Sequence, residues 1–267
     1  MQALSLSPLA GVQWVRDGYA LFRRQPVPMF SWALMIGLLV LVASMLVPVG
    51  PVLFIIVMPT ITVVTLQSCR LIEVGQTVQP WRVVGDVRRS GKMRMLLLAG
   101  GVYVSAVFGA GVLAFLPFMG GIAEVVRGID PDAGMAGLAA LSQAMQAPLI
   151  LFGIFYLIIA ALFWHAPALI AWHDMGLKKA LFFSGIACWR NKGAFVLYGL
   201  VWAAALLVLE VISMGLQVIG LSPQFAGFVQ MPLNFAFAAV LYCSFYSTYT
   251  TVFQDRSPEA PAPVSPE

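Results

Sequence analysis

The stretch from Gln25 to Cys69, QPVPMFSWALMIGLLVLVASMLVPVGPVLFIIVMPTITVVTLQSC, contains no Asp, Glu, Lys or Arg. Further uncharged stretches occur later in the chain, and over its whole length 61% of residues are hydrophobic and 10% are charged. A soluble domain carries about 25% charged residues. The composition therefore predicts an integral membrane protein.

Six stretches are long enough to cross a membrane as helices. A spanning helix needs about 20 apolar residues for about 30 Å of hydrocarbon. A single chain in lipid must satisfy its own backbone hydrogen bonds, and the alternation typical of barrel strands is absent. The sequence therefore predicts an all-α, polytopic six-helix transmembrane bundle with spans at 29–47, 52–69, 95–118, 148–172, 194–218 and 229–253.

The two sides of this bundle differ in charge. Basic residues precede the first span, fill the second and fourth connections and come after the last span, whereas Arg127 alone falls on the opposite side. Lys and Arg near the ends of spans stay in the cytoplasm, so both termini are expected there. The formal net charge of +4 is a topology signal, and no nucleic-acid partner is expected.

Residues 1–254 are expected to form one membrane domain. The remaining segment, 255–267, holds four prolines, two glutamates and no hydrophobic cluster. Such a composition cannot bury enough apolar surface to fold, so a disordered cytoplasmic tail is predicted.

A basic or amphipathic segment precedes each pair of spans. The three segments share a loose ending: Phe22-Arg23-Arg24, Val87-Arg88-Arg89 and Trp189-Arg190-Asn191. This spacing predicts three units, each made of an interfacial surface helix and a transmembrane hairpin.

The first of these segments has the clearest two-sided pattern. At 100° per residue its charged and apolar residues fall in opposite arcs. A helix of this kind lies in the membrane interface, with Trp14 and Tyr19 at headgroup level. Arg16, Arg23 and Arg24 would then meet anionic lipid at the cytoplasmic face, at about 1 kcal/mol each.

Glu210 is the acidic residue that falls inside a predicted span. An ionisable group there costs about 2.5–3.5 kcal/mol, which makes it a candidate functional residue. At 1.5 Å per residue it lies roughly 24 Å from the cytoplasmic edge of its helix, level with Tyr156 and Asn234 on neighbouring spans. Two interpretations stay open: a Glu that stitches helices together, or one that moves an ion or substrate.

His165 is the histidine inside a span, roughly 10 Å from the cytoplasmic edge. Its depth differs from that of Glu210 by about 14 Å, so the two cannot pair directly. A packed histidine next to Pro167 is the expected role.

The third span and the connection after it carry two further patterns. Gly101, Ser105 and Gly109 form a small-residue surface that suits close packing inside the bundle, with a homodimer interface as the alternative. The connection Met119–Ala147 is long enough for a small periplasmic helix with one face formed by Met135, Leu138, Leu141 and Met145.

Motifs for chemistry are absent. The sequence contains no Ser-His-Asp set, no Cys-x-x-Cys, no His-Glu-x-x-His and no phosphate-binding loop, so no enzyme, cofactor or metal is expected. Cys69, Cys188 and Cys243 lie in spans or on the cytoplasmic side, where disulfides rarely persist, and are expected to be free thiols.

A recognisable pattern begins near the end of the fourth span and extends into the fifth. It consists of Ala166-Pro167-Ala168-Leu169-Ile170, His173-Asp174, Lys178-Lys179-Ala180-Leu181, Ser184, Arg190-Asn191 and Leu197-Tyr198-Gly199-Leu200. With these residues the chain resembles a family of uncharacterised proteobacterial inner-membrane proteins. More distantly, it is similar to the membrane domain that accompanies glycerophosphodiester phosphodiesterases. The resemblance implies a location and an architecture but no site residues.

These observations favour a multi-pass protein of the bacterial inner membrane that is structural or accessory and acts through lipid or protein contacts. The expected partners are the lipid bilayer, with anionic headgroups at the cytoplasmic face, and a membrane protein. The alternative is a small permease that uses Glu210.

Overall fold

The computed structural model describes residues 3–129 and 134–254, and these residues contain helices and no strand. Six helical stretches are long and apolar enough to cross a membrane, which confirms the all-α, six-span prediction. They are α2 (Pro26–Met45), α3 (Val49–Glu73), α5 (Met93–Phe115) with η1 (Leu116–Phe118) and α6 (Met119–Gly128), α7 (Gly134–Trp164) with α8 (Ala166–His173), α10 (Lys192–Val218) and α11 (Pro223–Phe253).

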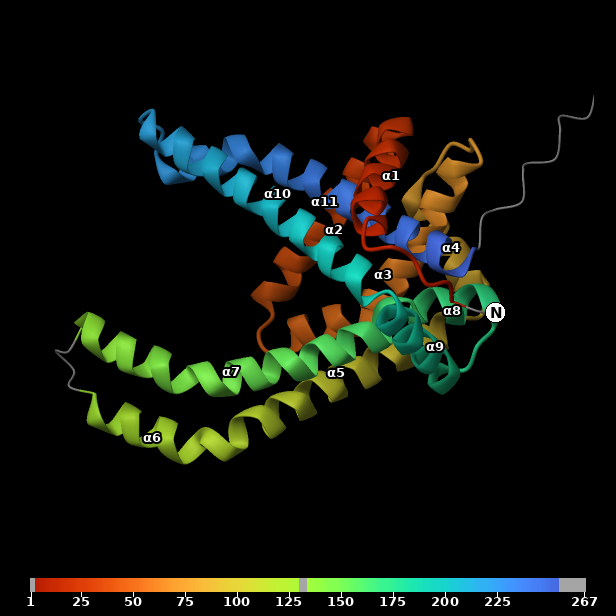
Figure 1. Ribbon diagram of the computed structural model, residues 1–267. Coiled ribbons are helices and arrows are strands. Elements are labelled where there is room, and N and C mark those ends of the chain that lie inside the picture. Colours follow the sequence, from red (N-terminus) through yellow and green to blue (C-terminus); the bar gives the residue numbers. More distant parts are fainter. Residues whose placement is uncertain (1–2, 130–133, 255–267) are drawn as a thin grey trace, which may run out of the picture.

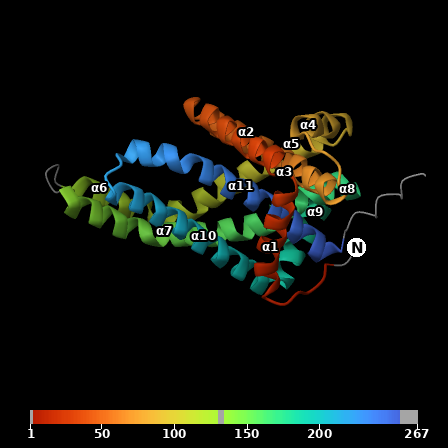
Figure 2. The same ribbon diagram turned by 90° about the horizontal axis from the view of Figure 1, so that it is seen from above.

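Three shorter helices precede the three hairpins, and each ends in arginine. They are α1 (Ala10–Arg24), α4 (Pro80–Arg89) and α9 (Leu177–Arg190). These helices and α8 gather at one end of the molecule, from which the hairpins α2–α3, α5–α7 and α10–α11 diverge (Figure 1). We call this the basal end. The view from above shows α8 and α9 at this same end, opposite α6 (Figure 2).

The second hairpin is longer than the sequence predicted. No separate periplasmic helix stands between residues 119 and 147 in the described part of this connection, because α6 and the first half of α7 continue the two spans. The span was predicted to begin at Pro148, yet this residue lies inside α7. Proline is tolerated within membrane helices, so it was a poor boundary signal here.

The fourth span breaks at His165, where α7 ends and α8 begins. In a continuous helix the His165 N–H would donate to the Ala161 carbonyl, four residues back. Instead the Ser184 hydroxyl of α9 stands between them: it accepts from His165 N at 2.9 Å and donates to Ala161 O at 2.8 Å. A side chain inserted into the helical ladder is a recognised cause of a kink. Ser184 thus repairs the break and fixes α9 against the hairpin.

Replacing Ser184 with Ala is expected to destabilise the protein by about 1–3 kcal/mol, because two buried backbone groups lose their partner. The free energy of unfolding in mixed micelles measures the effect. Ser142→Ala, at an exposed position of α7, is the matched control and should change nothing. Equal stability of the two variants would contradict the bridging role of Ser184.

Helix α1 packs directly on the backbones of α10 and α11. A Cβ at Gly11 would lie 2.3 Å from Ala194 O, and a Cβ at Gly18 would lie 2.6 Å from Ser244 Cα. Glycine is therefore the residue that permits this approach. The apolar face of α1 is covered by protein at these positions, and α1 belongs to the core.

Candidate functional site

The last third of α11, from Cys243 to Phe253, is largely buried at the basal end. Its hydroxyl groups accept hydrogen bonds from aromatic residues of other helices. Trp14 Nε1 donates to Thr251 Oγ1 at 2.6 Å, and Trp164 Nε1 donates to Thr248 Oγ1 at 3.2 Å. This segment is the central helix of the basal end.

The threonines of α11 are suited to accept because their protons are already committed. Thr248 Oγ1 donates to Phe245 O at 2.8 Å, and Thr251 Oγ1 donates to Ser247 O at 2.7 Å. The hydroxyl lone pairs are then available to the indole N–H groups. These polar groups form hydrogen bonds with one another and hold the helices together. They do not line a path for a solute.

Ionisable groups near α11 are paired in the same way. The Tyr246 hydroxyl donates to Glu73 Oε2 at 2.5 Å, and His173 Nε2 lies 2.6 Å from Tyr249 Oη.

The cysteines are not suited to nucleophilic chemistry. Burial raises the pKa of the Cys188 thiol on α9 to about 12, so this group is not a nucleophile near neutral pH. The three cysteines are free thiols, as expected.

A cavity of about 270 Å³ opens between α3, α4 and α8 at the basal end. Its lining combines apolar and polar side chains: Val63, Gln67, Leu71, Asp86, Val87, Ser90, Ala171 and Trp172. Trp172 Nε1 donates to Gln67 Oε1 at 3.0 Å. Within residues 3–129 and 134–254, nothing accepts a hydrogen bond from the Gln67 amide nitrogen. Gln67 thus lines the cavity with one hydrogen-bond donor unused.

The cavity residues of α3 lie at different depths, and Val63 is the deepest of them. At 1.5 Å per residue, Gln67 lies about 9 Å and Val63 about 15 Å from the end of α3 at Glu73. Asp86 of α4 and Ser90, which follows this helix, also line the cavity and are exposed. The cavity therefore combines exposed polar groups with apolar side chains, of which Val63 lies deepest along α3.

Cations lie beside this cavity. The Arg70 guanidinium carbon lies 5.2 Å from the centroid of the Trp172 ring. Arg89 Nη2 lies 2.6 Å from Asp86 Oδ1, and Lys92 pairs with Asp174. The arrangement can attract an anion while the apolar side chains accommodate an acyl chain.

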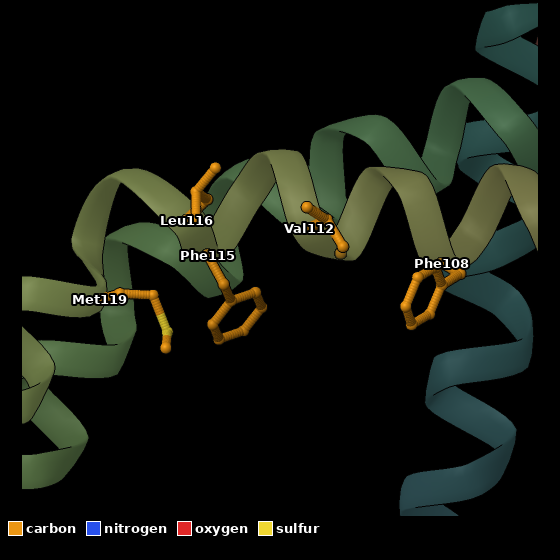
Figure 3. Close-up of a pocket in the computed structure, with 6 residues that line it drawn as sticks. Phe108, Val112, Phe115, Leu116 and Met119 are labelled. Atoms are coloured by element: carbon orange, nitrogen blue, oxygen red, sulfur yellow. The ribbon is translucent and has the colours of Figure 1, made fainter.

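A second hollow of about 530 Å³ runs along the exposed side of α5 and continues to Met119. Figure 3 shows Phe108, Val112 and Phe115 along it. Every lining residue is apolar or glycine, so contact with hydrocarbon is all that this hollow offers. The cavity between α3, α4 and α8 is the stronger candidate site.

The predicted intramembrane residues are not joined by hydrogen bonds in the described structure. Glu210 on α10 and Asn234 on α11 are exposed. Tyr156 on α7 is 42% exposed, and its hydroxyl lies 3.4 Å from that of Tyr103. Tyr156 thus belongs to another hairpin and pairs within it.

The predicted interface residues divide into two groups. Trp14 is fully buried, packed against Phe195 at 5.0 Å between ring centroids, so its predicted place among lipid headgroups was wrong. Tyr19 is 52% exposed, and the guanidinium carbon of Arg23 lies 5.9 Å from the centroid of its ring. Arg16 is exposed, and Arg24 Nη1 donates to Glu73 O at 3.1 Å.

The predicted small-residue surface of the third span was also wrong as a contact inside the bundle. A Cβ added at Gly101 or Gly109 would meet nothing within 4 Å. The neighbouring Gly100 makes the close approach, because its Cβ would lie 2.0 Å from Ile56 O of α3. A glycine of α5 does permit close packing, as predicted, but it is Gly100 and not the adjacent Gly101.

Sequence reasoning missed the cavity residues. One signal was available: Gln67 is the single amide side chain in the predicted span 52–69. A polar residue in a span usually faces the interior or a cavity. Its partner Trp172 lies 105 residues further along the chain, which no local pattern connects to it.

The fold defines an α-helical, multi-pass membrane protein. A search of curated proteins finds a probable inner membrane protein of Burkholderia thailandensis, 36% identical over 98% of this chain and 97% of the relative. The chain belongs to the family of this inner-membrane protein, which confirms the resemblance at that level.

The finer resemblance has no support. No family model matches the chain, so the similarity to the membrane domain of glycerophosphodiester phosphodiesterases is not borne out. No solved structure matches either.

Proposed function

We propose that this chain is an accessory protein of the inner membrane that binds a phospholipid in the cavity between α3, α4 and α8. The observation that carries the proposal is that one cavity combines apolar side chains, such as Val63, with polar side chains and has cations beside it. A phospholipid likewise combines apolar acyl chains with an anionic phosphate.

The proposed pose is set by depth. An acyl chain would run past Ala171 towards Val63, the deepest cavity residue of α3. The Gln67 amide nitrogen would donate to an ester carbonyl, and Arg70 and Arg89 would attract the phosphate. Each group of the lipid then meets a chemically matched group of the protein.

The proposed leaflet is set by charge. The basal end carries the basic residues of α1, α4 and α9, whereas Arg127 belongs to α6 at the opposite end (Figure 1). By the positive-inside rule the basal end faces the cytoplasm, with both termini on that side. Anionic headgroups of that leaflet would add attraction of about 1 kcal/mol for each cation near the surface.

The alternative of a small permease has less support. A transport site built on Glu210 would need further polar groups around it, but Tyr156 lies on a different hairpin and pairs with Tyr103. The polar side chains around α11 are occupied by hydrogen bonds to one another. An accessory role through lipid and protein contacts needs no such path.

Filling the cavity tests the proposal. Ala171→Phe is expected to remove the co-purifying phospholipid, and Gln67→Leu should weaken its binding about tenfold, because one hydrogen bond is lost. Lipid mass spectrometry of the protein, washed extensively in mild detergent, measures phospholipid per chain. Ala203→Phe, at an exposed position of α10, is the control. Equal lipid content in the wild type and all three variants would exclude the site.

A further inference from the structure

Glu210 stands in an apolar environment without a partner among the described residues. Its neighbours on α10 are exposed and apolar, with Leu207 67% and Val211 67% exposed. Glu210 lies about 12 Å from the end of α10 at Val218 and about 27 Å from its start at Lys192. This depth lies within the hydrocarbon, where an exposed carboxyl is costly and polar side chains usually pair.

Asn234 presents the matching group on the same hairpin. Gln230, one turn before Asn234, donates from Nε2 to Leu209 O at 2.9 Å. Leu209 directly precedes Glu210 and the two helices run antiparallel, so the backbone of Asn234 lies about 7.5 Å nearer the basal end than that of Glu210. Each side chain leans towards the N-terminus of its own helix, which reduces this difference in height. Both side chains are exposed, and the described structure records no hydrogen bond for either.

A carboxylic acid and a primary amide are complementary. Each can donate one hydrogen bond and accept one, so a facing pair forms two. The side chains do not form this pair within one chain. A partner that offers an amide and an acid at nearby depths would match both groups.

We propose that a second copy of this chain is that partner, with Glu210 of one copy hydrogen-bonded to Asn234 of the other. Copies inserted in one direction can form a closed pair only about a two-fold axis along the membrane normal. This axis keeps every residue at its own depth. Glu210 then meets Asn234 twice, once on each side of the axis, and no residue from another protein is required.

The α10–α11 hairpin has a large exposed apolar surface that is available for this contact. In the most apolar 18-residue segment of each helix, 11% of the α10 segment and 22% of the α11 segment is buried against the rest of the chain. Interhelical hydrogen bonds strengthen association of such surfaces in lipid. The cavity between α3, α4 and α8 lies at the basal end, so the pairing does not depend on the proposed lipid site.

Counting copies in native-like bilayers tests the proposal. The full-length protein, labelled with one fluorophore per chain, is expected to bleach in two steps, and the dimerisation constant should fall at least about tenfold in Glu210→Leu and in Asn234→Leu. Leucine suits hydrocarbon, so these variants should insert normally. Glu210→Gln should keep the dimer, because two amides also form a complementary pair.

Two controls separate this pairing from general apolar association. Val208→Ala, which is 59% exposed but lies about 160° around α10 from Glu210, should leave the dimerisation constant nearly unchanged. The exchange of Glu210→Asn with Asn234→Glu in one chain should restore the dimer, because each acid again faces an amide. One-step bleaching of the wild type, or an unchanged dimer in both leucine variants, would overturn the proposal.

Discussion

Replacing Trp14 with Ala is expected to lower the free energy of unfolding by about 3–5 kcal/mol, the range for large aromatic residues in cores. Trp14 is fully buried, contacts Phe195 and Tyr198 through its ring and donates to Thr251. The variant would lose these contacts and leave a cavity between α1, α10 and α11. Unfolding in mixed micelles, monitored by loss of helical signal, measures the difference.

The matched control for Trp14 is Trp189→Ala. Trp189 lies on α9, which is also a basal helix, but its side chain is 72% exposed. Its removal should cost far less than removal of Trp14, although the cation–π contact of Lys192, 4.6 Å from the ring centroid, would be lost. A Trp14 cost as small as that of Trp189 would return Trp14 to the role of a lipid anchor.

The case of α1 shows why the sequence could place a helix but not its neighbours. An amphipathic helix has the same pattern whether its apolar face covers lipid or protein. A distinguishing signal lay in the spacing of Gly11, Trp14, Gly18 and Leu21, which form one buried seam. Glycine at two positions of that seam favours close contact with another backbone, because lipid requires no such small residue.

The resemblance motif carried structural information that its pattern alone did not explain. Ser184 repairs the helix break before Pro167. Asn191 is buried, accepts from Leu6 N at 2.8 Å and donates to Leu4 O at 2.8 Å, so it fixes the segment before α1. These contacts join residues far apart in the chain. Sequence reasoning recognised the residues but could not assign their roles.

The spans were predictable because hydrocarbon thickness sets helix length and excludes charge. The candidate cavity was not, because it depends on how α4 and α8 meet α3. Pro148 misled for a related reason: in a soluble helix it would mark a boundary, whereas α7 continues through it. Local rules therefore located the elements, and tertiary contacts decided the sites.

The second large effect concerns the contact between α3 and α5. Gly100→Ala is expected to destabilise the protein by about 1–3 kcal/mol or more, because its Cβ would lie 2.0 Å from the Ile56 carbonyl oxygen. This obstacle is backbone, so the two helices would have to move apart. The free energy of unfolding in mixed micelles again measures the effect.

Gly101→Ala is the control one residue away. A Cβ there meets nothing within 4 Å, and Ala is favoured over Gly in a helix by about 0.5–1 kcal/mol. This variant should be as stable as the wild type or slightly more stable. The small-residue pattern of Gly101, Ser105 and Gly109, taken as a bundle contact, predicts the reverse order. The sign of the difference between the two adjacent substitutions therefore decides which face of α5 packs against α3.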